Sequence, residues 1–148
     1  MLFNVIPYFH FAQDDLFAKV AVSVIENHDA AGSAPMFLFF APHNVHEPLQ
    51  VPQWYMTHFD FIDYEPRQKY LAMVAHLDDV IGSLVTSLVA KGMWNDTLLV
   101  VSSDNGGPIY NNGNAGANNW TLHGGKVRYR RLAHAMLNEL EGPPFSAG

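Results

Sequence analysis

A first cluster of polar residues has the composition of a metal site. Asp104 and Asn105 are followed by Gly106 and Gly107, so two hard oxygen ligands stand on a backbone that can turn sharply. Such ligands suit calcium or magnesium, although a calcium shell needs about six to eight oxygens and two residues supply only part of it. The alternative is an ordinary turn after a strand, because Asp, Asn and Gly dominate turns for local reasons.

A second cluster contains two histidines, His43 and His46, within His-Asn-Val-His-Glu-Pro-Leu. A histidine just beyond a buried strand can donate a proton to an anionic oxygen or act as a general acid. The His-x-x-His spacing is also compatible with zinc. A pair of half-exposed loop histidines without a chemical role remains the third alternative.

A third motif, Gly124-Gly125-Lys126, brings a lysine close to a flexible backbone, where it can approach an anion. The motif is too short for a phosphate loop, which needs Gly-x-x-x-x-Gly-Lys-Ser/Thr. Taken alone, Lys126 is therefore better described as an exposed lysine at the end of a flexible loop.

Paired acids and glycosylation triplets complete the polar features. We interpret Asp14-Asp15 as helix N-terminal charge and Asp78-Asp79 as a solvated or boundary position on a helix. Asn95 and Asn119 each begin an Asn-x-Thr triplet, which makes them candidate glycosylation sites.

Four elements must position these residues. Apolar residues at helical spacing predict helices over 14–28, with Asp14 or Asp15 as the cap, and over 66–91. The apolar positions of the first helix are Leu16, Phe17, Val20, Ala21, Val24 and Ile25, and those of the second are Tyr70, Val74, Leu77, Ile81, Leu84 and Leu88. Continuous apolar runs over 36–41 and 97–101 predict strands that are buried on both faces.

The order strand, long helix, strand predicts an α/β fold. Such a unit normally gives two parallel strands with a right-handed crossover. Ligands of open α/β sheets bind beyond the carboxyl ends of the strands. His46 follows the first strand and Asp104 follows the second, so we expect both clusters at one edge of one sheet.

Composition excludes several classes of protein. A chain of 148 residues with 49% apolar and 15% charged residues has the length of one domain and is unlike a disordered protein. The formal net charge of −6 disfavours a nucleic-acid binder. The apolar runs are too short to span a bilayer, and the N-terminus lacks the basic flank of a secretory signal. Because cysteine is absent, disulfides, thiolate zinc sites and cysteine nucleophiles are excluded within these residues.

Several blocks of the sequence match one known family when they are taken together. They are Pro-Met-Phe-Leu-Phe-Phe-Ala-Pro-His-Asn-Val-His-Glu-Pro-Leu-Gln-Val-Pro at 35–52, Tyr-Leu-Ala-Met-Val-Ala-His-Leu-Asp-Asp-Val-Ile-Gly at 70–82, Gly-Met-Trp-Asn-Asp-Thr-Leu-Leu-Val-Val-Ser-Ser-Asp-Asn-Gly-Gly at 92–107 and Asn-Trp-Thr-Leu-His-Gly-Gly-Lys at 119–126. In this order they resemble the type I sulfatases, and more closely the arylsulfatase B-like group. Several ordered blocks are more specific than any single motif.

The resemblance implies a fold and a set of site residues. The fold would be alkaline-phosphatase-like α/β, incomplete here, with a mostly parallel sheet flanked by helices. Asp104 and Asn105 match two ligands of the family's calcium ion, and His46 and Lys126 match side chains that contact the sulfate. Cleavage of a sulfate ester builds negative charge on oxygen, which a metal ion, a cation and a histidine can stabilise.

The sequence departs from the family pattern in two respects. Family members carry a formylglycine made from the first residue of Cys/Ser-x-Pro-x-Arg. Here cysteine is absent, and Ser33-Ala34-Pro35 lacks the arginine. The acidic segment that supplies the remaining calcium ligands also has no counterpart. We therefore expect a partial catalytic domain over 1–126, without its nucleophile-bearing N-terminal part, and a divergent tail over 127–148 that is basic and then helical in pattern.

The functional expectation is a segment of a calcium-dependent sulfuric-ester hydrolase that acts on a sulfated small molecule or glycan. The alternative is a truncated or pseudoenzyme form that binds sulfated ligands, a missing segment or a full-length homologue. Phosphate or phosphonate ester hydrolysis is a third hypothesis, and the His-x-Pro-Leu-Gln block favours the sulfatase over it. Secreted or lysosomal localisation follows only by analogy with the family, and the sequence itself leaves it unknown. Exposed strand edges predict poor solubility for the isolated chain.

Overall fold

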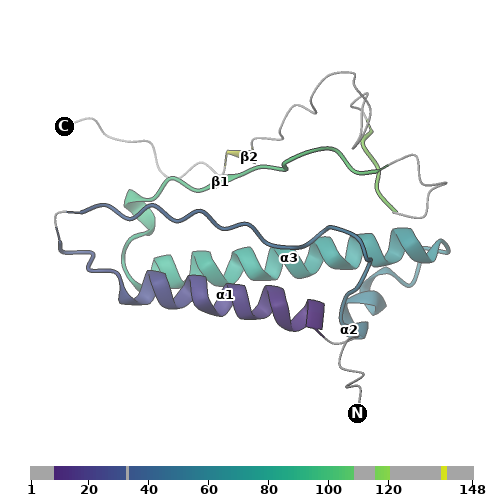
Figure 1. The fold of residues 1–148 in the computed structure, drawn as a ribbon, viewed down its shortest axis with the longest axis horizontal. Helices are drawn as coiled ribbons and strands as arrows, with labels where there is room; N and C mark the ends of the chain where they lie inside the picture. The colour runs from purple at the N-terminus through teal and green to yellow at the C-terminus, as the bar shows by residue number, and fades with distance from the viewer. Residues whose placement is uncertain (1–8, 33, 109–115, 121–137, 140–148) are drawn as a thin grey trace, which may run out of the picture.

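The computed structural model describes residues 9–32, 34–108, 116–120 and 138–139 (Figure 1). Two long helices, α1 (Phe9–Asn27) and α3 (Glu65–Ala90), form the body of this part of the chain. Three short helical elements lie before and after α3: α2 (Gln53–Met56), η1 (Thr57–Phe59) and η2 (Trp94–Asp96). Two short strands pair with each other, β1 (Val100–Val101) and β2 (Asn138–Glu139).

The chain forms two consecutive units, and each consists of a long helix followed by an extended segment. Helices α1 and α3 pack against each other and run in the same direction, while residues 34–42 and 97–106 both return in the opposite direction (Figure 1). Lys91 Nζ donates a 2.5 Å hydrogen bond to the Glu26 carbonyl, which joins the C-terminal ends of the two helices. The expected direction of the two apolar runs is therefore confirmed.

The predicted boundaries of the second helix are correct to within one residue. Pro66 lies in the first turn of α3, where its missing N–H costs no hydrogen bond. Gly92, just beyond the helix end, has φ +73° and supplies the left-handed conformation of a C-terminal stop. The predicted start of the first helix is wrong, because α1 begins at Phe9 and Asp14 lies inside it rather than at its cap.

The prediction of a mostly parallel sheet is wrong for the part of the chain that the structure describes. Residues 36–41 are extended but join no ladder, and β1 pairs antiparallel with β2, Val100 opposite Glu139 and Val101 opposite Asn138. A strand needs a neighbour for its N–H and C=O groups, and the two parallel-running segments do not provide it for each other. The strand at 138–139 also replaces the helix expected there in the tail.

The segment at 36–41 nevertheless has the two faces of a strand. Met36, Leu38 and Phe40 pack against the cluster formed by Ala21, Ile25, Leu84 and Leu88 of the two helices. Phe37 and Phe39, which alternate with them, are 91% and 80% exposed. This is the geometry of a sheet layer that helices cover on one side.

The predicted apolar faces of the helices are only partly buried. Leu84 and Leu88 of α3 are in the core, whereas Val74 is exposed. In α1 the buried side chains include Ala18, Ala21 and Ile25, and the exposed ones are Leu16, Phe17, Val20 and Val24. Both helices thus have more apolar surface than their mutual contact covers.

Helix α3 is long and apolar enough to cross a membrane if length and composition are the only criteria. The core helix of a globular domain passes the same test. Its buried side chains include Met73, His76 and Leu84. They pack inside the described fold, and one of them is polar, as in the core helix of a globular domain.

Candidate functional site

His46 lies in the loop that follows the extended segment, as the sequence predicts. The His46 N–H donates to the His43 carbonyl at 3.1 Å, which closes a turn, and the two imidazole rings have their centroids 5.9 Å apart. His46 Nδ1 is 2.7 Å from the Glu47 carbonyl oxygen. Because a carbonyl oxygen only accepts, this hydrogen bond assigns the proton to Nδ1.

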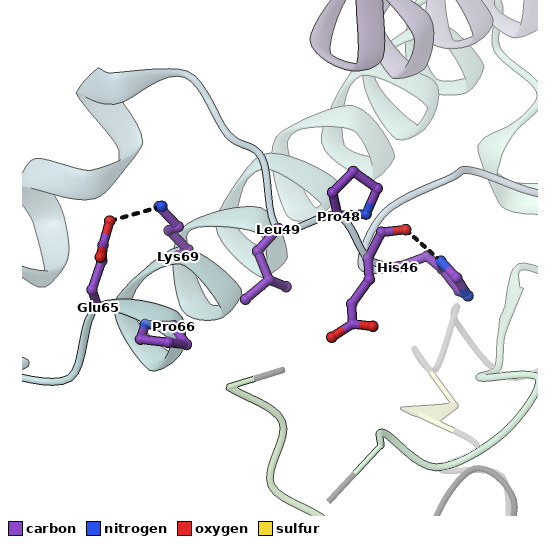
Figure 2. A pocket seen from close by; sticks show the side chains of 7 residues that line it. His46, Pro48, Leu49, Glu65, Pro66 and Lys69 are labelled. Carbon is purple, nitrogen blue, oxygen red and sulfur yellow. Dashed lines mark hydrogen bonds and ion pairs between the residues drawn. The ribbon is translucent and has the colours of Figure 1, made fainter. Parts of the chain in front are cut away.

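A cavity of about 630 Å³ opens beside this loop, as Figure 2 shows. Its lining comes from the loop on one side and from the first turns of α3 on the other: His46, Glu47, Pro48, Leu49, Glu65, Pro66 and Lys69. Lys69 Nζ and Glu65 Oε1 form an ion pair at 2.7 Å. The hydrogen bond and the positive charge of Lys69 lower the pKa of Glu65. The cavity therefore has a histidine on one wall and a paired lysine on the opposite wall.

Asp14 holds the start of the histidine loop. Its carboxylate is buried, with 1% of the residue exposed. Oδ1 accepts the His43 N–H at 2.7 Å and Oδ2 accepts the Asn44 N–H at 3.1 Å. The sequence analysis assigned Asp14 to helix capping and missed this contact, which spans 29 residues of the sequence.

 A second set of contacts joins the same loop to the middle of α3. The Asn44 side-chain nitrogen is 2.8 Å from His76 Nδ1, and His76 Nε2 is 3.0 Å from Asp15 Oδ1. His76 is 3% exposed, and the Tyr55 ring meets it edge-on with centroids 5.2 Å apart. A polar His76 within the apolar repeat of the second helix was the available sequence signal.

Tyr55 extends this network to Asp79. Its hydroxyl donates to Asp79 Oδ2 at 2.6 Å. Burial raises the pKa of Tyr55 to about 12, with further contributions from the hydrogen bond and charge of Asp79 and from the charge of Asp15. Asp78 and Asp79 are both exposed, as the sequence predicts.

The raised pKa of Tyr55 predicts a loss of stability at alkaline pH. The tyrosine of the unfolded chain ionises near 10, whereas folded Tyr55 keeps its proton up to about 12. Its contribution is therefore complete below pH 10 and is lost as the pH rises through about 12. Tyr55→Phe should remove this component, which urea denaturation over that pH range will measure. Equal pH dependence in the two proteins would contradict the assignment.

Asp104 and Asn105 are exposed just after β1. Ser103 Oγ donates to the Asn105 carbonyl at 2.6 Å, and Asn105 Nδ2 donates to the Gly106 carbonyl at 3.2 Å. Among the described residues, no group of three or more His, Cys, Asp or Glu side chains could hold a metal ion. These two residues thus offer part of a calcium shell.

Residues 116–120 are attached to this region by side-chain hydrogen bonds. Asn119 Oδ1 accepts the Gly107 N–H and Asn119 Nδ2 donates to the Gly107 carbonyl, both at 2.9 Å. Arg67 Nη1 donates to the Gly116 carbonyl at 2.9 Å. The segment is therefore held both to the turn after β1 and to the start of α3.

The remaining site predictions stay untested. Asn95 is exposed in η2, whereas Asn119 is half-buried with its amide nitrogen bonded to Gly107, so Asn95 is the more accessible glycosylation candidate. Lys126 and the expected domain boundary at 126/127 lie outside the described residues.

Comparisons with known proteins agree with the sequence blocks. The family model described as Sulfatase matches residues 3–135. Arylsulfatase J of Mus musculus is 34% identical over 114 residues, which are 77% of this chain and 18% of that protein. Crystal structures of Ps i-CgsB alone and in complex with k-i-k-neocarrahexaose give TM-scores of 0.69 and 0.67 at 34% identity.

These similarities cover most of this chain and a small part of its relatives. The two crystal structures cover 76% of this chain, which in turn covers 24% of theirs. The match extends over α1, the histidine loop, α3 and the turn after β1, because all of them fall within residues 3–135. The chain belongs to the sulfatase family.

Proposed function

We propose that this chain is a segment of the catalytic domain of a sulfuric-ester hydrolase. In this proposal His46 and Lys126 contact the sulfate group, while Asp104 and Asn105 provide two ligands of a calcium ion. The observation that carries it is that the extended segments leading to the His46 loop and to the Asp104–Asn105 turn run in the same direction beside the helix pair (Figure 1). Family membership supports the reaction class.

The described residues have chemistry that suits a sulfate ester. Negative charge develops on the bridging and sulfuryl oxygens as the S–O bond breaks, and donors aimed at those oxygens stabilise it. His46 Nδ1 bonds the Glu47 carbonyl, and in this proposal Nε2 contacts the sulfate. A bound calcium ion would supply Lewis acidity. The nucleophile belongs to the complete enzyme, because these residues contain no Cys/Ser-x-Pro-x-Arg motif.

A sulfated glycan is the substrate class that the cavity beside His46 favours. Its volume of about 630 Å³ is within the range of small-molecule pockets. Lys69 is paired with Glu65, and Glu47 adds a second carboxylate, so the lining offers polar groups for the hydroxyls of a carbohydrate. The complex of Ps i-CgsB with k-i-k-neocarrahexaose supports a carbohydrate ligand by analogy.

Sulfate binding by the purified 148-residue chain tests the proposal. Sodium sulfate should shift the imidazole resonances of His46 and the backbone amide resonances of its loop in an NMR titration, with and without calcium chloride, and the amides report the affinity in variants that lack the ring. His46→Ala should weaken binding about 10–100-fold, because a hydrogen bond to a charged group contributes about 1.5–3 kcal/mol. His28→Ala is the matched control, since His28 follows the C-terminal end of α1 and lies away from the cavity lining. Equal affinity in His46→Ala and the wild type would overturn the assignment.

A non-catalytic protein that binds sulfated ligands is the second candidate. It is favoured by retained anion-binding residues in a sequence that has no cysteine. The reading frame of the native transcript upstream of residue 1 separates the two candidates. A Cys/Ser-x-Pro-x-Arg motif upstream supports the enzyme, whereas an upstream sequence without it, together with heat in calorimetry of the chain with a sulfated disaccharide, supports the binding protein.

A further inference from the structure

We propose that Asp14 is the positioning residue for the His46 loop, and that His76 and Asp15 support the same loop through Asn44. The role of His46 itself rests on the proposed function. The anchoring of the loop rests on hydrogen bonds and burial alone, so the two can be tested separately.

The Asp14 carboxylate has the contacts of a backbone anchor. A buried carboxylate is costly unless hydrogen bonds compensate for its lost hydration. Each of its oxygens accepts one N–H, from His43 and from Asn44. Bonds to an ionised acceptor are stronger than neutral ones. Because His46 N–H bonds back to the His43 carbonyl, fixing His43 also fixes the backbone of His46.

His76 connects Asp15 to the side chain of Asn44. A carboxylate only accepts, so the contact with Asp15 places a proton on Nε2 of His76. In the neutral ring Nδ1 is then an acceptor for the Asn44 amide nitrogen. With the Asn44 amide nitrogen toward the ring, the two contacts correspond to a proton on Nε2 and an acceptor at Nδ1.

Asp14 and Asp15 differ in the number of hydrogen bonds that each carboxylate accepts. Asp14→Asn and Asp15→Asn are therefore a matched pair of variants. Both oxygens of Asp14 accept an N–H, so Asp14→Asn would point its NH₂ group at one of the two donors. Asp15 uses one oxygen toward His76, and Asp15→Asn keeps an equivalent acceptor. Asp14→Asn should therefore release the loop, whereas Asp15→Asn should leave it in place.

Amide hydrogen exchange of the 148-residue chain is the first test. In Asp14→Asn, exchange at His43 and Asn44 should accelerate about 10–100-fold, while the core amides of Ile25 and Leu84 stay protected. Asp15→Asn should exchange like the wild type. Unchanged exchange at His43 and Asn44 in Asp14→Asn would overturn the inference, and so would equal acceleration throughout both helices, which indicates a general structural role.

Two further measurements keep the inference testable. Imidazole ¹⁵N spectra of the wild type should show His76 with a proton on Nε2, and a ring protonated only on Nδ1 overturns the network even if Asp14→Asn does not fold. The response of His46 to sodium sulfate should weaken in Asp14→Asn and persist in Asp15→Asn. If wild-type His46 ignores sulfate while Asp14→Asn releases the loop, the proposed function fails and the anchoring stands.

Discussion

Ile25→Ala is expected to lower the free energy of unfolding by about 2–5 kcal/mol. Ile25 is 1% exposed and lies in the cluster that joins α1, α3 and the extended segment at 36–41. Truncating it removes buried apolar surface and leaves a cavity, because the neighbouring side chains relax only partly. Urea denaturation followed by circular dichroism will measure the change.

Val24→Ala is the matched control for Ile25→Ala. Val24 is the preceding residue of the same helix but is 46% exposed, so its truncation should change stability by less than about 1 kcal/mol. A similar loss in both variants would contradict the described orientation of α1. Since Leu38 and Phe40 pack on the same cluster, Ile25→Ala should also loosen the segment that leads into the histidine loop.

The parts of the fold that the sequence predicts well are those that local patterns determine. Helix α3 has a proline in its first turn, a glycine just after its end and a long apolar repeat between them, and its bounds agree to within one residue. The sheet could not be predicted in the same way, because a strand depends on its neighbours. The exposed side chains of Phe37 and Phe39 show that one face of the extended segment has no cover within the described residues.

In the candidate site, too, the sequence predicts the features that depend on the order of elements and misses those that depend on tertiary contacts. The position of His46 after the first apolar run and of Asp104 after the second follows from the order of elements, which the sequence contains. The hydrogen bond from His43 to Asp14 joins residues that are 29 positions apart, which no local pattern predicts. A carboxylate near a helix start is already explained by the helix dipole, so the sequence gives no reason to expect a second contact. Buried polar residues at apolar helix positions, such as His76, are the signal that a tertiary hydrogen bond leaves in a sequence.

Gly116→Ala is expected to detach residues 116–120 from the start of α3 and to cost about 2–4 kcal/mol. Gly116 has φ +65°, which is unfavourable for alanine. An added Cβ would overlap the Pro66 carbonyl oxygen and lie 2.9 Å from the Arg67 nitrogen. These are backbone atoms of a helix, so the glycine segment must move instead. Exchange of the Gly107 amide, which Asn119 protects, and urea denaturation will measure the effect.

Gly82→Ala is the control that separates steric overlap from a general effect of replacing glycine. Gly82 lies inside α3, and an added Cβ there meets nothing within 4 Å. Alanine should therefore stabilise the helix by about 0.5–1 kcal/mol, opposite in sign to Gly116→Ala. If Gly116→Ala keeps both its stability and the protection of Gly107, the described attachment is wrong. If it loses both, the turn that carries Asp104 and Asn105 depends on contacts with α3 that lie outside its own sequence.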